Sequence, residues 1–193
     1  DLVLVHHGYF WKGESPEITG IKQRRLKTLL QNDISLLAYH LPLDVHEIVG
    51  NNAQLASLLN LEIIGPLEPG SSLSVGQVGK LAKPLTAEQF RVFVSKQLKR
   101  DCVHIGEPDK LIETLGFCTG AAQGMIEHAA DLGLDAYLSG EISEPTVHLA
   151  NETGVNYFSA GHHATETGGV KAFGELLQQQ FEIEFKFIDI VNP

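Results

Sequence analysis

Short apolar runs alternate with amphipathic stretches along the whole chain, and this rhythm constrains the fold more than any other feature. Leu2–Val5 is a continuous apolar run, typical of a strand buried on both faces of a parallel sheet. Gly20–Leu30 sets apolar residues among basic ones at helical spacing, which indicates an amphipathic helix. Repeated units of this kind predict an α/β fold in which mixed or parallel sheets are flanked by helices.

The same pattern predicts the remaining elements. We expect further strands at Ile34–Tyr39, Leu61–Ile64, Cys102–Ile105, Glu113–Cys118, Asp135–Leu138 and Val155–Ser159. Leu73–Ala82 contains glycine and predicts a weak strand or a hairpin. We expect further helices at Asn51–Leu59 with an Asn N-cap, Ala87–Lys99 behind a Thr86-x-x-Gln89 capping box, Gln123–Leu132, Pro145–Asn151 and Ala164–Gln179. Phe181–Ile190 alternates strongly and predicts a half-exposed edge or antiparallel strand.

A stretch rich in Pro, Gly and Ser between residues 66 and 72 is the most linker-like part of the chain. It predicts two α/β domains, residues 1–66 and residues 67–193. The chain opens at Asp1 directly into a strand, and its only Met is Met125. We therefore expect that further N-terminal residues precede this sequence and belong to the first domain.

Charge and composition exclude several classes of function. Lys plus Arg is 14 and Asp plus Glu is 24, which gives a net charge of −10. Nucleic acids and anionic membranes are therefore not expected as electrostatic partners. Apolar runs such as Ile34–Tyr39 are far shorter than the ~20 residues of a membrane-spanning helix. Two cysteines, Cys102 and Cys118, form no disulfide framework and favour a cytoplasmic protein.

Histidines follow the first strand directly, at His6 and His7 before Gly8. Neighbouring side chains in a strand point to opposite faces. The pair can therefore share one site only where the pleat breaks, or bind two ions from two sides. One core histidine and one surface histidine is the simpler interpretation of the pair by itself.

His40 and Asp44 follow the second strand and flank Pro42, which predicts a loop and not a helix face. Asp44 is either an oxygen ligand or a turn residue, and taken alone the turn is the simpler role.

His162 and Glu166 open the last long helix. They are four residues apart, so they share a helix face and can bind one ion, while His163 points elsewhere. Gly168 and Gly169 weaken that helix by roughly 1 kcal/mol each relative to Ala, a cost that often marks the close approach of another group.

Glu141 lies at another strand end and could act as a general base or support a ligand. Glu144, nearby, is more simply a favourable charge at a helix start.

Together these strand ends present nitrogen and carboxylate ligands for two ions, which is the layout of a binuclear hydrolytic site. Zn, Mn or Fe would suit such a mixed set. The chain has no paired-cysteine metal motif, no G-x-S-x-G and no glycine-rich phosphate loop.

Three motifs in this order resemble the GTP cyclohydrolase I type 2 homologue family, which includes the YbgI and Nif-three-like proteins. They are Val5–Gly13 (VHHGYFWKG), His40–Asp44 (HLPLD) and Gly161–Glu166 (GHHATE). The resemblance runs through the whole chain and is closest to the bacterial YbgI type. Members carry one or two helix–strand units ahead of the first motif.

The resemblance implies two α/β domains, a toroidal homohexamer and a centre of two divalent transition-metal ions per subunit. Carried over by motif, the metal ligands are His6, His7, Asp44, His162 and Glu166, with Glu166 bridging and residues 160–193 returning ligands to a shared site. His40 also matches a motif position, and it is expected beside the ligands rather than among them. From the residues themselves, His40 or Glu141 could relay protons in catalysis.

The function expected from the resemblance is a metal-dependent hydrolase that acts on GTP or a related or modified nucleotide. The alternative is a non-catalytic, ring-shaped metal-binding scaffold or metal-handling protein. The absence of a nucleotide-pocket motif favours the alternative, whereas a mixed His and carboxylate set with open coordination positions favours the enzyme.

Overall fold

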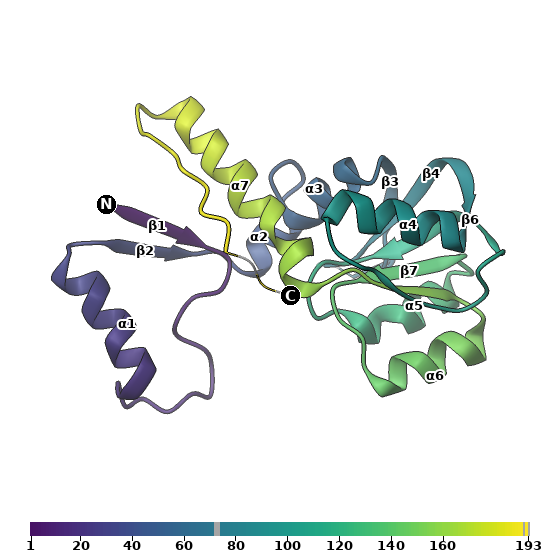
Figure 1. The fold of residues 1–193 in the computed structure, drawn as a ribbon, viewed down its shortest axis with the longest axis horizontal. Coiled ribbons are helices and arrows are strands. Elements are labelled where there is room, and N and C mark those ends of the chain that lie inside the picture. Colours follow the sequence, from purple (N-terminus) through teal and green to yellow (C-terminus); the bar gives the residue numbers. More distant parts are fainter. Residues whose placement is uncertain (72–73, 191, 193) are drawn as a thin grey trace.

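The structure is a computed structural model that describes residues 1–71, 74–190 and 192. Within these residues the strands form two sheets (Figure 1). A small parallel pair joins β1 (Leu2–Val5) to β2 (Ser35–Ala38), and a larger sheet has the order β3-β4-β6-β7-β8-β5. The strands of the larger sheet are β3 (Leu61–Pro66), β4 (Gln77–Thr86), β5 (Val103–Ile105), β6 (Leu111–Phe117), β7 (Ala136–Ser139) and β8 (Asn156–Ser159).

The larger sheet is mixed. β6, β7 and β8 run parallel, whereas β3, β4 and β5 pair antiparallel with their neighbours. The helices are α1 (Gly20–Gln31), α2 (Leu41–Val45), α3 (Asn51–Leu58), α4 (Ala87–Leu98), α5 (Ile126–Asp131), α6 (Glu144–Thr153) and α7 (His162–Gln180), with one 3₁₀ turn, η1 (Gln123–Met125). The α/β class expected from the sequence is therefore confirmed.

Two apolar clusters hold the helices against the larger sheet. On one face, Phe90 of α4 and Leu59 at the end of α3 are fully buried against Leu115 and Phe158 of the sheet. On the other face, α5 and α6 bury their apolar sides around Tyr137. Burying one such side chain stabilises the fold by about 1.5–3 kcal/mol, so this three-layer unit is a rigid support.

The C-terminal ends of β6, β7 and β8 form one edge of the larger sheet, from which α7 begins. Because β6, β7 and β8 are parallel, their C-terminal ends meet at the same edge, and only two residues separate β8 from the start of α7. Figure 1 shows α7 reaching from this edge toward β1 and β2. Residues from the first and last quarters of the chain therefore come together there.

The sheet pairing bears on the predicted domain division. β3 ends at Pro66 but pairs with β4, so the change from one sheet to the other falls between β2 and β3. The division into residues 1–66 and 67–193 itself stays a prediction.

Three local predictions are wrong. β1 is a strand, but Leu2 and Val3 are exposed rather than buried on both faces, because β1 pairs only with β2 among the described residues. Residues 41–45 form the short helix α2 instead of a loop, since Pro42 sits in the first turn, where its missing N–H costs nothing. The N-cap of α3 is Gly50, and Asn51 directs its side chain elsewhere.

The segment after α7 is also not a strand. Residues 181–190 are extended and run back beside α7 (Figure 1), but no strand is assigned to them. Phe185 lies against Gly174 of α7, and its backbone N–H donates to Gln178 Oε1, so apolar contact with the helix replaces a ladder of strand hydrogen bonds.

The predicted strand Leu73–Ala82 begins at β4 residue Gln77. Ser72 and Leu73 lie outside the described residues. Among the described residues, no helix combines the length and the hydropathy needed to cross a membrane.

Candidate metal centre

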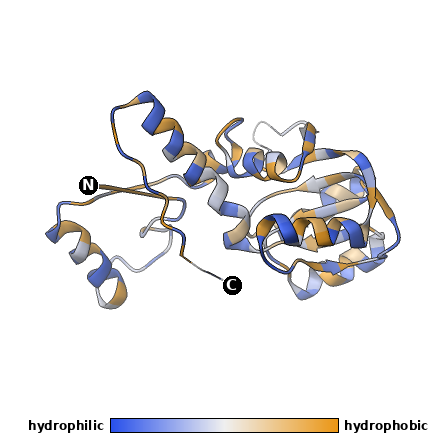
Figure 2. Cartoon of the chain, turned by 45° about the horizontal axis from the view of Figure 1, so that its top comes forward, coloured by the Kyte–Doolittle hydropathy of each residue, from blue (hydrophilic) through white to orange (hydrophobic). Residues whose placement is uncertain are grey.

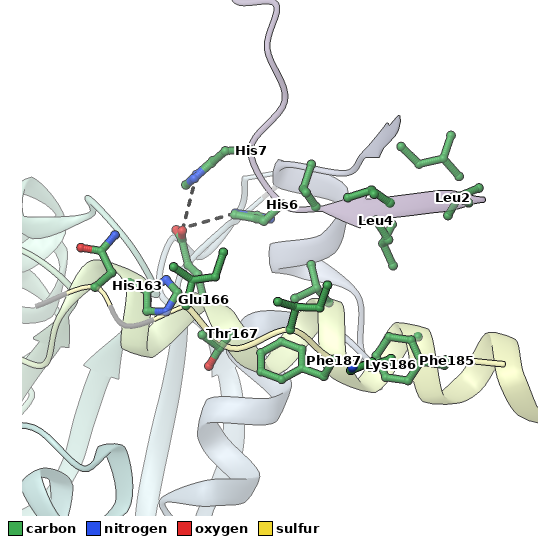
Figure 3. Close-up of a pocket in the computed structure, with 18 of the residues that line it drawn as sticks. Leu2, Leu4, His6, His7, His163, Glu166, Thr167, Phe185, Lys186 and Phe187 are labelled. Carbon is green, nitrogen blue, oxygen red and sulfur yellow. Dashed lines mark ion pairs between the residues drawn. The ribbon is translucent and has the colours of Figure 1, made fainter. Parts of the chain in front are cut away.

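Side chains from three separated segments converge at the C-terminal edge of the larger sheet. His6 and His7 follow β1, Asp44 lies on α2, and His162 and Glu166 lie in the first turns of α7. Figure 3 shows both histidines of the first pair directed at Glu166. β1 and its alternating pleat end at Val5, so His6 and His7 can face the same site. This is one of the two arrangements that the sequence allowed for the pair.

Glu166 lies between two sets of ligands. Its Oε1 is 3.7 Å from Nε2 of His6, which in turn is 3.4 Å from Oδ1 of Asp44. Its Oε2 is 3.4 Å from Nε2 of His7 and 2.9 Å from Nε2 of His162. Two groups of possible metal ligands therefore share Glu166, one formed with His6 and Asp44 and the other with His7 and His162.

Hydrogen bonds on the far side of two imidazole rings set their orientation. His6 Nδ1 lies 2.9 Å from the carbonyl oxygen of Tyr39, which can only accept, so Nδ1 carries the proton. His162 Nδ1 donates in the same way to Glu141 Oε1 at 2.6 Å. In the neutral rings the lone pair is then on Nε2, which faces carboxylate oxygens in both cases.

These two Nε2 atoms provide a test of whether the residues fit a metal. Both are buried and have no hydrogen-bond partner among the described residues. A lone pair that faces carboxylate oxygens without a proton between them is repelled unless a cation lies there. Nitrogen and oxygen donors arranged in this way fit divalent Zn, Mn or Fe.

Asp44 is fixed by neutral donors. Its Oδ1 accepts from Asn51 Nδ2 at 2.8 Å and from Thr119 Oγ1 at 3.3 Å. Asn51 also accepts the backbone N–H of Gly169 on α7 at 2.8 Å, so one amide joins Asp44 to the helix that carries Glu166. A Cβ at Gly169 would lie 2.5 Å from Asn51 Oδ1, which confirms that this glycine marks a close approach.

Gly120 lies against the carboxylate of Glu166, where a residue with a Cβ atom does not fit. Gly120 follows β6 with φ +68°, and a Cβ there would lie 2.0 Å from Glu166 Oε1. Thr165 Oγ1 accepts the N–H of Gly120 at 3.1 Å, which ties this turn to α7. The backbone of the β6 turn therefore forms the floor of the site.

Electrostatics couple the cluster. Burial lowers the pKa of His6, but the contact with Glu166 and the charge of Asp44 outweigh it, so the net pKa is raised. Burial also dominates at His7 and lowers its pKa despite Glu166. For Glu166, burial raises the pKa, and the histidines His6, His162 and His7 together lower it below its ordinary value. The Glu166 carboxyl is thus held as an anion.

The remaining predicted residues lie around this cluster. Glu141 contacts His162, as described above. The His40 ring centroid is 5.0 Å from that of His6 and 5.2 Å from that of His7, and His40 can form a third ligand group with both. The Trp11 ring lies beside those of His7 and His40, with centroid distances of 5.7 and 5.1 Å, tilted against the first and edge-on to the second. His163 belongs to no ligand group among the described residues.

The structure brings together the ionisable residues that the sequence singled out, and it adds neutral residues that were not predicted: Asn51, Thr119 and Gly120. The signal available for Gly120 was its place three residues after the end of β6, at the edge of the sheet where the ligands gather. Nothing in the sequence around Asn51 separates a ligand support from an ordinary N-cap.

A cavity of about 1580 Å³ opens beside the cluster. It lies between β1, α7 and the extended segment that carries Phe185 and Phe187 (Figure 3). His6, His7, His162 and Glu166 line one end of it, together with Arg100. A small molecule in this cavity would reach the ligand groups directly.

Comparison with known proteins supports one family. The family model described as Duf34/NIF3 (NGG1p interacting factor 3) matches residues 1–193. A curated protein of Pseudomonas aeruginosa described as "GTP cyclohydrolase 1 type 2 homolog" is 56% identical over the whole chain and 76% of its own length. The protein of that description from Escherichia coli K12 is 45% identical, with the same coverage.

Solved structures of similar proteins match the fold of this chain. The protein ybgI, described as of unknown function, matches the whole chain and 76% of its own with a TM-score of 0.95 and 45% identity. TTHA1606 from Thermus thermophilus matches the whole chain and 75% of its own with a TM-score of 0.86 and 32% identity.

Proposed function

The chain belongs to the Duf34/NIF3 family, and from this premise we propose that it binds two divalent metal ions and acts as a metal-dependent hydrolase. The observation that carries the proposal is the placement of Glu166, whose two oxygens face different ligand groups. One ion would be held by His6 and Asp44 and the other by His7 and His162, with Glu166 bridging both.

The donor set supports Zn, Mn or Fe as the metal. Cys102 and Cys118 take no part, because both are buried and burial raises the pKa of each thiol to about 12. They stay protonated at neutral pH and are poor ligands there.

When bound, the two ions would supply Lewis acidity, which polarises a substrate bond and acidifies water at neutral pH. The protein's own residues prepare the site for this chemistry. Tyr39 and Glu141 hold protons on Nδ1 of His6 and His162, and so keep each Nε2 turned inward. Asn51 and Thr119 hold Asp44 in place without adding charge.

We assign proton transfer to Glu141 and His40. Glu141 is partly exposed while its Oε1 accepts from His162, so the carboxyl can exchange protons with solvent. His40 is exposed beside His6 and His7. Either group could deliver a proton to the leaving group as water is added across a carbon–nitrogen or phosphoester bond.

GTP or a related or modified nucleotide is the proposed substrate. Its support is the description of the relatives as homologues of GTP cyclohydrolase 1 type 2, together with a cavity large enough for a nucleotide. A cytoplasmic location remains a prediction from the two free cysteines.

The proposed assembly is a toroidal homohexamer, as the family resemblance implies. Several large apolar side chains are exposed on the part of the chain that holds β1, β2 and α1, and an uncovered apolar surface of this kind often lies in an interface. They include Leu2, Val3, Phe10, Ile21, Leu30 and Leu37. Mass photometry of the purified protein would test the assembly.

The test of the metal centre is metal content by plasma mass spectrometry on tag-free protein purified without added metal. We expect about two transition-metal ions per chain. Glu166→Gln should lose them, whereas Glu175→Gln, an exposed change on the same helix, should keep them. No metal in the wild type, with none taken up on reconstitution, would contradict the proposal.

The test of the reaction is turnover of GTP and modified nucleotides by the metal-loaded protein. Activity should disappear in Asp44→Ala and Glu166→Gln together with the metal. Turnover that survives metal loss would refute the hydrolase. Bound metal without turnover of any nucleotide would favour the alternative, a non-catalytic metal-binding scaffold or metal-handling protein.

A further inference from the structure

Arg100 lies beside the proposed metal centre and has no role in the site described so far. It follows α4, where Lys99 ends the helix in the left-handed conformation and the N–H of Arg100 donates to the carbonyl oxygen of Ser95 at 3.2 Å. Its side chain is half-buried and lines the cavity that His162 and Glu166 also line. A cation is therefore anchored from a different element at the wall of the same cavity.

The backbone ahead of α7 makes room for this guanidinium. Gly161 has φ +96°, and a Cβ there would lie 2.0 Å from Arg100 Nη1 and 2.6 Å from its Cζ. The guanidinium thus lies directly on the backbone of the residue that precedes His162. Only glycine permits both the conformation and this approach.

Arg100 has no acidic partner among the described residues. No carboxylate oxygen there lies within 4.0 Å of its nitrogens, and its hydrogen bond runs from Nε to the carbonyl of Asp101 at 3.4 Å. Of the acidic residues that line the cavity, Glu141 pairs with His162 and Glu166 with the three histidines, while Asp1 and Glu184 form no ion pair with Arg100. The two terminal nitrogens of Arg100 therefore have no hydrogen-bond acceptor among the described residues, and the side chain lines the cavity.

We propose that Arg100 binds a phosphate group of the substrate, which places phosphorylated small molecules as the substrate class of this site. The planar fork of a guanidinium presents paired N–H groups that match two phosphate oxygens. The anion would then be held at the start of α7 while the adjacent part of the substrate reaches the ligand groups. This inference rests on the proposed function and adds to it the residue that selects the substrate.

The test is isothermal titration calorimetry, in which the metal-loaded protein is titrated with inorganic phosphate at constant ionic strength. Arg100→Gln should weaken phosphate binding by at least about tenfold, the usual loss for a charged hydrogen bond. Arg100→Lys keeps the charge but loses the planar pair of N–H groups, so its phosphate affinity should lie between those of the wild type and Arg100→Gln. Lys99→Gln is the matched control, because it makes the same charge change on a neighbouring exposed residue outside the cavity.

Metal content and thermal unfolding are measured on the same samples. Equal phosphate affinity in wild type, Arg100→Gln and Arg100→Lys, with metal retained, would overturn the role of Arg100 and leave the metal centre intact. Absence of metal from the wild type would instead overturn the proposed function and this inference with it. Acetate is titrated in parallel, and a dependence on Arg100 seen with acetate but not with phosphate would overturn the assignment to phosphate.

Discussion

At the residue scale, the site depends on small and neutral residues as much as on its ionisable ones. Glu166 and the histidines supply charge and lone pairs, but Asn51 and Gly120 decide where those atoms lie. Residues that orient metal ligands commonly change metal affinity by about 10–100-fold when they are replaced. Substitutions at these neutral positions are therefore informative tests of the geometry.

Gly120→Ala should reduce metal affinity by about tenfold or more while the protein still folds. The new Cβ would overlap Glu166 Oε1, and φ +68° is strained for alanine, so Glu166 must move. Competition with a chromophoric chelator measures the affinity. Gly124→Ala is the control, because a Cβ there meets nothing within 4 Å. Equal affinity of both variants would contradict the proposed placement of Glu166.

Cys102 should make stability depend on alkaline pH. Burial raises the pKa of its thiol to about 12, outweighing the nearby Arg91 and Arg100, while the unfolded chain has an ordinary thiol near ~8.5–9. The folded state holds the proton more tightly, so this contribution is complete below the unfolded pKa and is lost as pH rises toward 12. Relative to Cys102→Ala, the wild type should lose about 1–2 kcal/mol of unfolding free energy between pH 8 and pH 10. Urea unfolding of both proteins at the two pH values measures this, and parallel curves would refute it.

At the element scale, α7 both carries candidate metal ligands and serves as a packing surface for other segments. Only the first of these roles was predicted from its sequence in full. Its first turns carry His162 and Glu166, and its later turns receive Asn51 at Gly169 and Phe185 at Gly174. Glycine costs helix stability, roughly 1 kcal/mol relative to alanine, and here each glycine admits a neighbouring side chain. The extended segment 181–190 is held to the helix by that fit and not by a strand ladder.

Gly174→Ala should loosen the extended segment. The added Cβ would lie 2.1 Å from Phe185 Cε2, and overpacking of this kind costs about 1–3 kcal/mol, more than the gain in helix propensity. Hydrogen exchange of residues 183–187 should become faster. The double variant Gly174→Ala with Phe185→Ala should show non-additive stability, because removal of the ring removes the clash. Additive effects would show that the two residues do not meet.

At the scale of the whole molecule, the proposed centre connects parts that few other contacts join. Figure 2 shows apolar residues along β1, which pairs only with β2 among the described residues and lies away from the larger sheet. His6 and His7 at the end of β1 face Glu166 of α7 and Asp44 of α2. A metal bridge at this point would therefore tie the small sheet to the rest of the fold.

Removal of metal by a chelator should lower the unfolding temperature of the wild type. A ligand present at a hundred times its Kd stabilises the folded state by about 2.7 kcal/mol per site, which for a chain of this size is a shift of about 5–10 °C. Glu166→Gln, which lacks the bridge, should not respond to the chelator. Differential scanning calorimetry with and without chelator measures both. A metal-containing wild type that ignores the chelator would contradict the structural role of the metal.

The local features of this protein could be predicted from residues that are close together in the chain. Strand and helix periods, the capping box at Thr86 and the four-residue spacing of His162 and Glu166 depend on neighbours along the chain, and the structure confirms them. Local patterns misjudged residues 41–45 and 181–190, because the first lies in a helix too short to show a period and the second alternates without a strand partner.

The geometry of the site, in contrast, depends on contacts between residues that are far apart in the chain. Asn51 meets Gly169 across 118 residues, Thr119 meets Asp44 across 75, and Arg100 lies on Gly161. Neutral residues such as Asn51, Thr119 and Gly161 carry no periodic or charge signal, and a glycine or an asparagine has many ordinary uses in turns and caps. These residues acquire their roles only in the folded chain. There the parallel strands end at one edge, and α7 places His162 and Glu166 beside His6 and His7.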